Sequence, residues 1–325
     1  MTSELIRPPR LAEGDHIVVV SPSSTIADRL AAADAARSRL EKTFGVEITY
    51  SKNARGQHFY SSGTARQRSD DIMSAFTDPT VRAVFFSTGG ATAIDVVDQL
   101  DYDIIAANPK IVAGLSDSST LLNAITARAG VVTFHGFEMF DFADQELPYA
   151  AQSLRSVLFE GWSGPYEPNP DWRDLHNEST AYATWREIRG GVAQGPAVGG
   201  NSDAFMQLIG TSYAPRLEGA MLFLETYRLQ KRHIQALFEE LKLRGAFDAI
   251  RGLVIGYCLG SDAPGVGNER FIGDIALEAT DGYEFPMMQV GEIGHQVENL
   301  IVPVGAEIRI DASKQELHLL GPAVI

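Results

Sequence analysis

Several features that mark other classes of protein are scarce in this sequence of 325 residues. It has one cysteine, Cys258, so no intramolecular disulfide can form, and the apolar run around it predicts a packing thiol. A formal net charge of -15 at pH 7 comes without any run of basic residues. Such a chain does not attract phosphate backbones or anionic membranes, so we expect neither nucleic acid nor a membrane as a partner.

Signals for membrane insertion, secretion and cofactor binding are also missing. No stretch approaches the ~18 uninterrupted apolar residues of a membrane-spanning helix, and residues 1–10 lack the apolar core of a signal peptide. The zinc motif H-E-x-x-H is absent, and the turn at Gly89-Gly90 matches neither common phosphate-binding pattern. We therefore predict a cytoplasmic protein that uses no metal and no other cofactor.

What the chain does contain is the composition of a soluble enzyme. Hydrophobic residues make up 45% and charged residues 21%, and the length suits two domains with cores of their own. Around residues 162–177 the pattern lapses into Gly, Pro, Asp and Asn, which is typical of a linker. We predict an N-terminal domain over residues 1–160, a linker over 161–180 and a C-terminal domain over 181–325.

Short apolar runs alternate with helical patterns through the first half. Strands are expected at residues 16–20, 46–50, 81–87, 110–113 and 131–134, with helices at 27–44, 65–76, 92–100 and 118–129. This β-α repetition predicts an α/β domain with a parallel sheet, of the flavodoxin or glutamine-amidotransferase type. The second domain is expected to be a smaller, mixed α/β unit, because residues 301–320 alternate apolar and polar side chains like a hairpin.

One serine stands where a nucleophile is commonly found. Residues 110–119 read as a strand, a tight Gly turn and a helix, which presents the Ser116 hydroxyl at the edge of the sheet. The next N–H, on Asp117, then points to a substrate oxygen at the positive end of the helix. The pattern alone is ambiguous: Ser118 replaces the second Gly of G-x-S-x-G, Ser202 lies in a similar Gly-x-Ser-Asp run, and either serine suits a helix N-cap.

Other segments favour the nucleophile. In the first half these segments are His58 to Thr64, Ser87 to Gly90, Leu100 to Asp103, Ala107 to Lys110 and Gly114 to Asp117. In the second half they are Leu217 to Glu225, Leu241 to Asp248, Gly294-His295 and Val302 to Gly305. In this order they resemble the LD-carboxypeptidase family of serine peptidases, and more closely its microcin C immunity branch. The resemblance covers nearly the whole chain and is thinnest at the predicted linker.

The resemblance implies a catalytic triad in the order Ser, Glu, His. Ser116 matches the nucleophile, Glu225 the Glu that closes the family's Leu-Phe-Leu-Glu strand, and His295 the His of its Gly-His pair. A serine hydroxyl needs an imidazole to accept its proton, and the imidazole needs a carboxylate to orient it. Taken singly, Glu225 is best interpreted as a solvated carboxylate and His295 as a loop histidine. Because both match the family's triad together with Ser116, a catalytic role is favoured.

The remaining predicted site residues surround this triad. We expect the N–H groups of Gly90 and Asp117 to form the oxyanion hole, since Gly90 lets a substrate approach the backbone closely. Thr88 and Ala91 stand where carboxypeptidase members often have Arg and an aromatic residue, so they are candidate substrate contacts. Trp185 is another, although a Trp packed against the second domain suits the pattern better, and His135 is interpreted as structural or pocket-lining.

Two classes of function remain open at this point. The favoured class is a serine carboxypeptidase-like amidohydrolase, with an acyl-enzyme on Ser116 and an active site between the domains. Its substrate is either the L,D-amide bond of a muropeptide or a peptidyl or aminoacyl nucleotide of the microcin type. The alternative is a non-catalytic ligand-binding or sensor protein that keeps the two-domain cleft. The resemblance also implies a homodimer.

Overall fold

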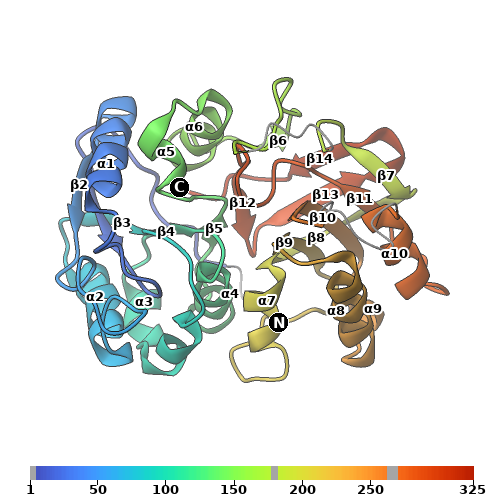
Figure 1. Cartoon of the computed structure of the whole chain (residues 1–325), viewed down its shortest axis with the longest axis horizontal. Coiled ribbons are helices and arrows are strands. Elements are labelled where there is room, and N and C mark those ends of the chain that lie inside the picture. Colours follow the sequence, from blue (N-terminus) through green and yellow to red (C-terminus); the bar gives the residue numbers. More distant parts are fainter. Residues whose placement is uncertain (1–4, 177–181, 262–269) are drawn as a thin grey trace.

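The computed structural model describes residues 5–176, 182–261 and 270–325, which form two units that each surround one β-sheet (Figure 1). The first sheet has the strand order β12-β5-β4-β3-β1-β2. Its strands are β1 (His16–Val20), β2 (Glu47–Tyr50), β3 (Val81–Phe86), β4 (Ile111–Gly114), β5 (Thr133–His135) and β12 (Val302–Val304). Strands β1 to β5 are parallel, as the β-α repetition predicted, and their near-continuous burial is typical of a sheet covered on both faces.

Helices connect these strands. They are α1 (Leu30–Phe44), α2 (Ala65–Thr77), the 3-10 helix η1 (Ala93–Gln99), α3 (Tyr102–Ala107), α4 (Ser118–Ala129), α5 (Asp141–Asp144), α6 (Pro148–Leu154) and the π-helical turn η2 (Arg155–Phe159). Local sequence explains several ends: Gly45 ends α1 in the left-handed conformation, and a capping box of Thr64 and Gln67 begins α2. The helix predicted from residue 27 begins three residues later, and the one predicted at 92–100 is a 3-10 helix.

The second sheet is mixed, with the order β6-β14-β13-β8-β9-β10-β11-β7. Its strands are β6 (Gly164–Pro165), β7 (Arg186–Arg189), β8 (Val192–Asn201), β9 (Met221–Tyr227), β10 (Gly252–Leu259), β11 (Met287–Gln289), β13 (Glu307–Asp311) and β14 (Glu316–Leu319). Strands β8 to β11 are parallel, and the outer strands are antiparallel. The helical segments of this unit are α7 (Ser202–Leu208), α8 (Lys231–Leu243), α9 (Ala246–Ala249), α10 (Ile272–Ala279) and η3 (Ala312–Lys314).

The predicted hairpin at residues 301–320 is confirmed only from Glu307 onward, where β13 and β14 pair through η3. The preceding strand, β12, instead pairs with β5 in the first sheet, where Val302 and Val304 are buried. A period-2 pattern shows that a segment is extended, but it does not identify the partner strand. The second half of the chain therefore contributes one strand to the first sheet.

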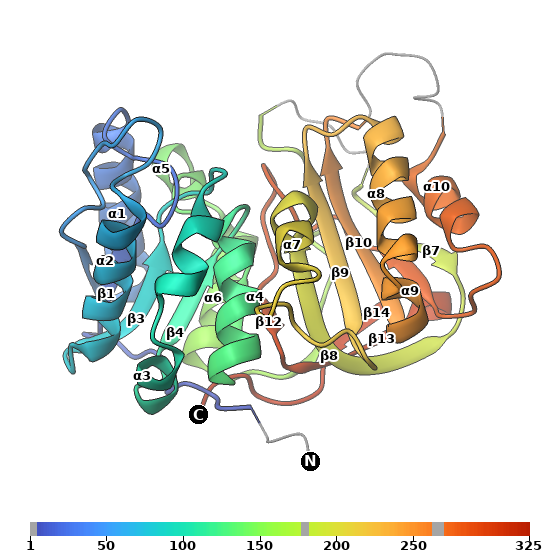
Figure 2. The ribbon, with the colours of Figure 1, turned by 90° about the horizontal axis from the view of Figure 1, so that it is seen from below.

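The two units meet along a shared core. Helix α4 packs on α7 and β8, and β12 contacts β8 (Figure 2). One continuous cluster of buried apolar side chains includes Val112 and Leu121 from the first unit and Phe223 and Met288 from the second. Because packed cores hold their neighbours rigidly, this cluster fixes the loops of one unit relative to those of the other. In the described part of the chain, no helix combines the length and apolarity needed to cross a bilayer.

Candidate active site

Ser116 lies on a strained turn between β4 and α4. Its φ of 66° is left-handed, a conformation that non-glycine residues rarely adopt and that is common where a nucleophile is presented. Two glycines allow close packing here: a Cβ on Gly89 would lie 2.4 Å from Ser116 Oγ, and one on Gly114 would lie 2.8 Å from Ser118 Cβ. The turn leaves the Ser116 side chain partly exposed, as a nucleophile requires.

Glu225 and His295 form a buried pair. His295 Nδ1 lies 2.7 Å from Glu225 Oε2, and the glutamate is 0% exposed. Glu225 is in β9, whereas His295 follows Gly294 in a loop whose backbone is held by Asn299: the Asn299 amide accepts from Gly294 N and donates to Gly294 O. Tyr227 packs against the imidazole, with ring centroids 4.6 Å apart. These contacts hold His295 in one orientation.

Asn201 connects this pair to the turn that carries the serine. Its Nδ2 donates to Glu225 Oε1 at 2.9 Å, and its backbone N donates to Ser119 Oγ at 3.0 Å, in the first turn of α4. The structure therefore places Ser116 and the Glu225–His295 pair on elements that one residue joins, through its side chain on one side and its backbone on the other. Sequence reasoning assigned no role to Asn201, although the Gly199-Gly200-Asn201 segment is a signal that could have found it.

Electrostatics keep Glu225 ionised. Burial alone would raise its pKa, but the charge and hydrogen bond of His295, together with the Asn201 amide, outweigh burial and lower the pKa. Burial alone would lower the pKa of His295, but Glu225 and the nearby carboxyls of Glu138 and Asp141 raise it. The pair is therefore an ion pair when His295 is protonated, and Glu225 lies where it stabilises a positive charge on the imidazole.

Two carboxyl groups after β5 were missed in the sequence. Burial raises the pKa of Glu138 to about 7, against the opposing effects of His295 and Arg29, and burial with the like charge of Glu138 raises the pKa of Asp141 well above its usual range. Both follow the carboxyl end of a parallel strand, the edge at which sites of open α/β sheets gather. That position was their only signal in the sequence.

His135 ends β5 and is fully buried between the units. Its ring lies 5.2 Å from that of Phe223, and neither ring nitrogen has a hydrogen-bonding partner among the described residues. Burial lowers its pKa to about 4, so the ring is neutral. A Cβ on Gly200 would lie 2.9 Å from this ring, which shows how closely β8 approaches it. We interpret His135 as a packing residue of the junction.

The two predicted oxyanion donors lie on either side of the serine turn. A Cβ on Gly89 would also lie 3.3 Å from Asp117 N, so the Gly89-Gly90 turn passes beside that amide. Gly90 has a φ of 149°, and any side chain there would collide with Ser23 and Ser24. In the described ranges, neither the Gly90 nor the Asp117 amide donates to a protein acceptor.

The candidate substrate contacts have different environments. Ala91 is exposed next to Gly90, and the partly exposed Thr88 has its Oγ1 3.4 Å from the Arg29 guanidinium, which lies over the Phe140 ring. Trp185 is not brought to this site: it is 2% exposed and donates from Nε1 to Glu292 at 2.5 Å. Its ring fills the core, which leaves almost no surface for a substrate. No three His, Cys, Asp or Glu side chains in the described residues are grouped to hold a metal.

Comparison with known proteins identifies the family. Residues 17–136 match the LD-carboxypeptidase N-terminal domain and residues 194–310 match the LD-carboxypeptidase C-terminal domain. The microcin C7 self-immunity protein MccF of Escherichia coli is 26% identical over 85% of this chain and 84% of its own. The murein tetrapeptide carboxypeptidase of Pseudomonas aeruginosa is 28% identical over 92% of this chain and 94% of its own.

The fold agrees with this relationship. The solved structure of MccF in complex with aspartyl sulfamoyl adenosine superposes with a TM-score of 0.89 at 23% identity, over 98% of this chain and 100% of that one. Both halves of the present chain thus match, in sequence and in architecture, a two-domain α/β carboxypeptidase-like enzyme. The protein belongs to the LD-carboxypeptidase family.

Proposed function

We propose that this protein is a serine amidohydrolase in which Ser116 is the nucleophile, His295 the general base and acid, and Glu225 the residue that orients the imidazole. The observation that carries the proposal is the buried Glu225–His295 hydrogen bond of 2.7 Å, joined through Asn201 to the helix that follows Ser116. A carboxylate, an imidazole and a strained, partly exposed serine are the three parts that such chemistry needs.

The reaction begins when His295 Nε2 accepts the Ser116 proton as Oγ attacks the amide carbonyl. His295 binds Glu225 through Nδ1, so Nε2 is the nitrogen available for the transfer. The imidazolium then donates this proton to the leaving nitrogen, and the C–N bond breaks to give an acyl-enzyme. Water attacks the ester, with His295 again as base, and Ser116 is released.

Charge on the carbonyl oxygen must be stabilised as the tetrahedral intermediate forms. The Gly90 and Asp117 amides are the proposed donors, because they flank Ser116 and neither is used by a protein acceptor within the described ranges. Loss of one such donor costs about 3 kcal/mol of transition-state stabilisation in enzymes of this kind.

Two substrate classes suit the site. One is the L,D-amide bond of a muropeptide, as the murein tetrapeptide relative suggests, and the other is a peptidyl or aminoacyl nucleotide, as the microcin relative suggests. Both carry an anionic group, a carboxylate or a phosphate-like group, and the exposed Arg29 guanidinium beside Thr88 is placed to bind it. The carboxyl groups of Glu138 and Asp141, whose pKa values are raised, offer oxygen acceptors for a substrate ammonium group, and the positive charge of such a group would favour their ionised forms.

The test is hydrolysis of a muropeptide tetrapeptide and of an aminoacyl-sulfamoyl nucleotide by the wild type and by Ser116→Ala. We expect the wild type to cleave at least one of them and Ser116→Ala to lose about 10⁴-fold or more of that activity. The matched control is Ser202→Ala, in the rival Gly-Asn-Ser-Asp turn, which should retain activity. Full activity of Ser116→Ala would refute the proposal, and a wild type that binds both compounds without cleaving either would favour a sensor protein.

Assembly and location form the remaining part of the proposal. The homodimer and the cytoplasmic location stay predictions. Light scattering of the purified protein and fractionation of the cells that make it test them directly.

A further inference from the structure

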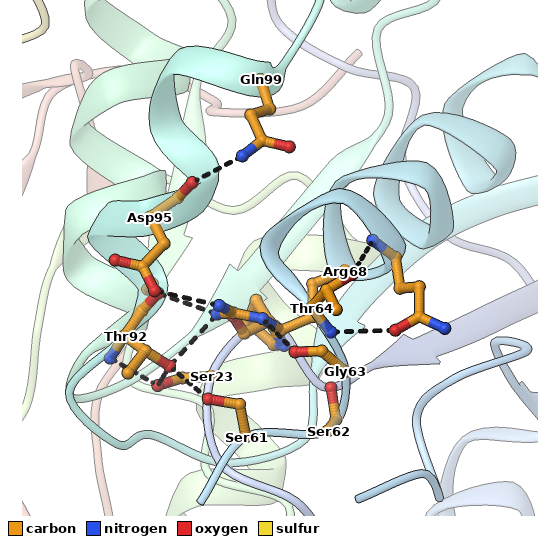
Figure 3. Close-up of polar contacts among 12 residues, drawn as sticks. Ser23, Ser61, Ser62, Gly63, Thr64, Arg68, Thr92, Asp95 and Gln99 are labelled. Carbon is orange, nitrogen blue, oxygen red and sulfur yellow. Dashed lines mark hydrogen bonds and ion pairs between the residues drawn. The ribbon is translucent and has the colours of Figure 1, made fainter. Parts of the chain in front are cut away.

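A buried arginine stands beneath the loops that flank Ser116. Arg68, in α2, is 2% exposed, and its guanidinium donates to the carbonyl oxygens of Pro22 and Thr92 at 2.5 and 2.8 Å (Figure 3). Its Nε donates to the Gly63 carbonyl, and Nη2 pairs with Asp95 at 3.2 Å. A buried charge is costly unless it is fully hydrogen-bonded. The hydrogen bonds that the Arg68 guanidinium needs therefore fix the geometry of the loops that supply the acceptors.

A chain of hydroxyl groups leads from this cation to Asp117. Arg68 Nη1 lies 3.1 Å from Thr92 Oγ1, which lies 3.2 Å from Ser23 Oγ. Ser23 Oγ in turn donates to Asp117 Oδ2 at 2.5 Å. The Asp117 side chain is 3% exposed and accepts a second bond from Ala93 N at 2.8 Å.

The proton directions along this chain are consistent. Arg68 can only donate, and Asp117 as a carboxylate can only accept, so Ser23 donates to Asp117. Thr92 donates to Ser23 when Ser61, whose Oγ lies 3.0 Å from Thr92 Oγ1, is the donor in that contact. Thr92 N also donates to Ser23 Oγ, at 3.0 Å, which leaves the single Ser23 proton for the carboxylate. Every hydroxyl dipole then points the same way, from the cation to the anion, and such aligned hydrogen bonds strengthen one another.

The chain ends at the groups that the proposed mechanism uses. Asp117 carries one proposed oxyanion donor in its own backbone, and Gly90, which carries the other, lies directly over Ser23: a Cβ on Gly90 would be 2.3 Å from Ser23 Oγ. The donors come from different loops, after β3 and after β4, so no local structure sets their separation. The contacts of Ser23 with Asp117 and Thr92 join these two loops.

We infer that Arg68, Thr92 and Ser23 form a hydrogen-bonded relay of positioning residues. The relay ends on the Asp117 carboxylate and holds the Gly90 and Asp117 amides at the separation that an oxyanion hole requires. The inference rests on the proposed function, and none of the three side chains touches the reacting atoms. It assigns the Asp of the Gly-Leu-Ser-Asp turn a role for its side chain, in addition to the role of its backbone.

The test removes hydroxyl groups from the relay without changing charge. Ser23→Ala cuts the bond to Asp117. Thr92→Val cuts the hydroxyl contacts with Arg68, Ser23 and Ser61 while keeping the shape of the side chain and the backbone bonds of Thr92 to Arg68 and Ser23. Because donors displaced by less than 1 Å lose much of their effect, we expect each variant to lower kcat by about 10-fold to 100-fold with KM within about 3-fold. Thr92→Ser restores the hydroxyl and should recover most of the loss.

Ser62→Ala is the matched control. Ser62 is buried like Ser23, with 3% of its surface exposed against 0%, and it donates to the Ser21 carbonyl at 2.6 Å but has no bond to Asp117. It should lose as much thermal stability as Ser23→Ala and keep wild-type kcat. Equal kcat in Ser23→Ala and wild type, or equal losses in Ser23→Ala and Ser62→Ala, would overturn the inference.

A second measurement separates this inference from the proposed function. The rate at which a fluorophosphonate modifies Ser116 reports nucleophile and oxyanion hole without any natural substrate. A wild type that is not modified at Ser116 would refute the proposed function itself, and the relay with it. If the wild type is modified at Ser116, and Ser23→Ala and Thr92→Val are modified at the same rate as the wild type, the relay alone is refuted.

Discussion

The tetrapeptide pattern Gly-x-Ser-Asp occurs twice in this chain, each time where a parallel strand ends and a helix begins, and the two copies differ in burial and in the backbone conformation of the serine. At the end of β4, Ser116 has a left-handed backbone and a partly exposed hydroxyl, and Asp117 is buried. At the end of β8, Ser202 is 0% exposed inside the first turn of α7, and Asp203 is exposed.

The residue before each serine accounts for the difference. Leu115 is an apolar residue that fills the core, so the turn around Ser116 is set by neighbouring glycines and by the contacts of Asp117. Asn201 instead caps α7 by accepting from Ala204 N, and its amide donates to Glu225. One turn therefore presents the proposed nucleophile, and the other supports Glu225, the proposed partner of the proposed base.

The largest expected effect comes from closing the space beside each turn. Gly89→Ala places a methyl group 2.4 Å from Ser116 Oγ, so the serine must move. We therefore expect activity to fall about 10²-fold to 10³-fold, with a small change in stability. Gly200→Ala, whose φ is 127° and whose Cβ would meet Ser119, should instead destabilise the junction of the units by about 2 kcal/mol or more. Hydrolysis rates and thermal unfolding of both variants check this, and the reverse ranking would contradict the comparison.

A smaller effect is expected from Asn201→Ala. The substitution removes a helix cap and one of the two hydrogen bonds that hold Glu225, so kcat should fall about 10-fold and stability by about 1 kcal/mol. Asp101→Ala removes the cap of α3, where the side chain accepts from two backbone amides, and provides the control. It should lose similar stability and no activity; a loss of activity as large as that of Asn201→Ala would show that the Glu225 contact is irrelevant.

The smallest effect concerns pH. His295 must be neutral to accept the Ser116 proton, and its pKa is raised by Glu225, Glu138 and Asp141, so kcat/KM should fall as pH drops through a value above 6.5, the usual pKa of the side chain. Burial keeps the neighbouring His135 neutral, so its ring adds no positive charge beside His295. Glu138→Gln removes the part of a negative charge that Glu138, with a pKa of about 7, carries in this range, and should move the acid limb to lower pH.

The control for the pH experiment is Glu146→Gln, a change at an exposed position in the segment that follows Glu138. Its pH profile should match that of the wild type. An acid limb that stays in place in Glu138→Gln, or moves to higher pH, would show that Glu138 does not act on His295.

Features that depend on local sequence could be predicted, whereas features that depend on distant partners could not. Strands β1 to β5 were predictable because a sheet buried on both faces leaves near-continuous apolar runs, and Ser116, Glu225 and His295 were named from motifs that resemble the family. Trp185 was named as a candidate substrate contact although a packed Trp suited the pattern better, and in three dimensions Glu292 accepts from its N–H inside the core. Asn201, Glu138 and the relay from Arg68 depend on partners far away in the chain, which local patterns do not report.

By itself, the sequence determined the alternation of strands and helices, the family and the identity of the proposed triad, because periodicity, turn residues and short motifs are local properties. Tertiary structure alone decided which of two similar serine turns is exposed, which sheet residues 302–304 join, and how a buried arginine reaches Asp117. Those outcomes depend on which surfaces exclude water from one another, and burial of that kind is set by the packing of the whole chain.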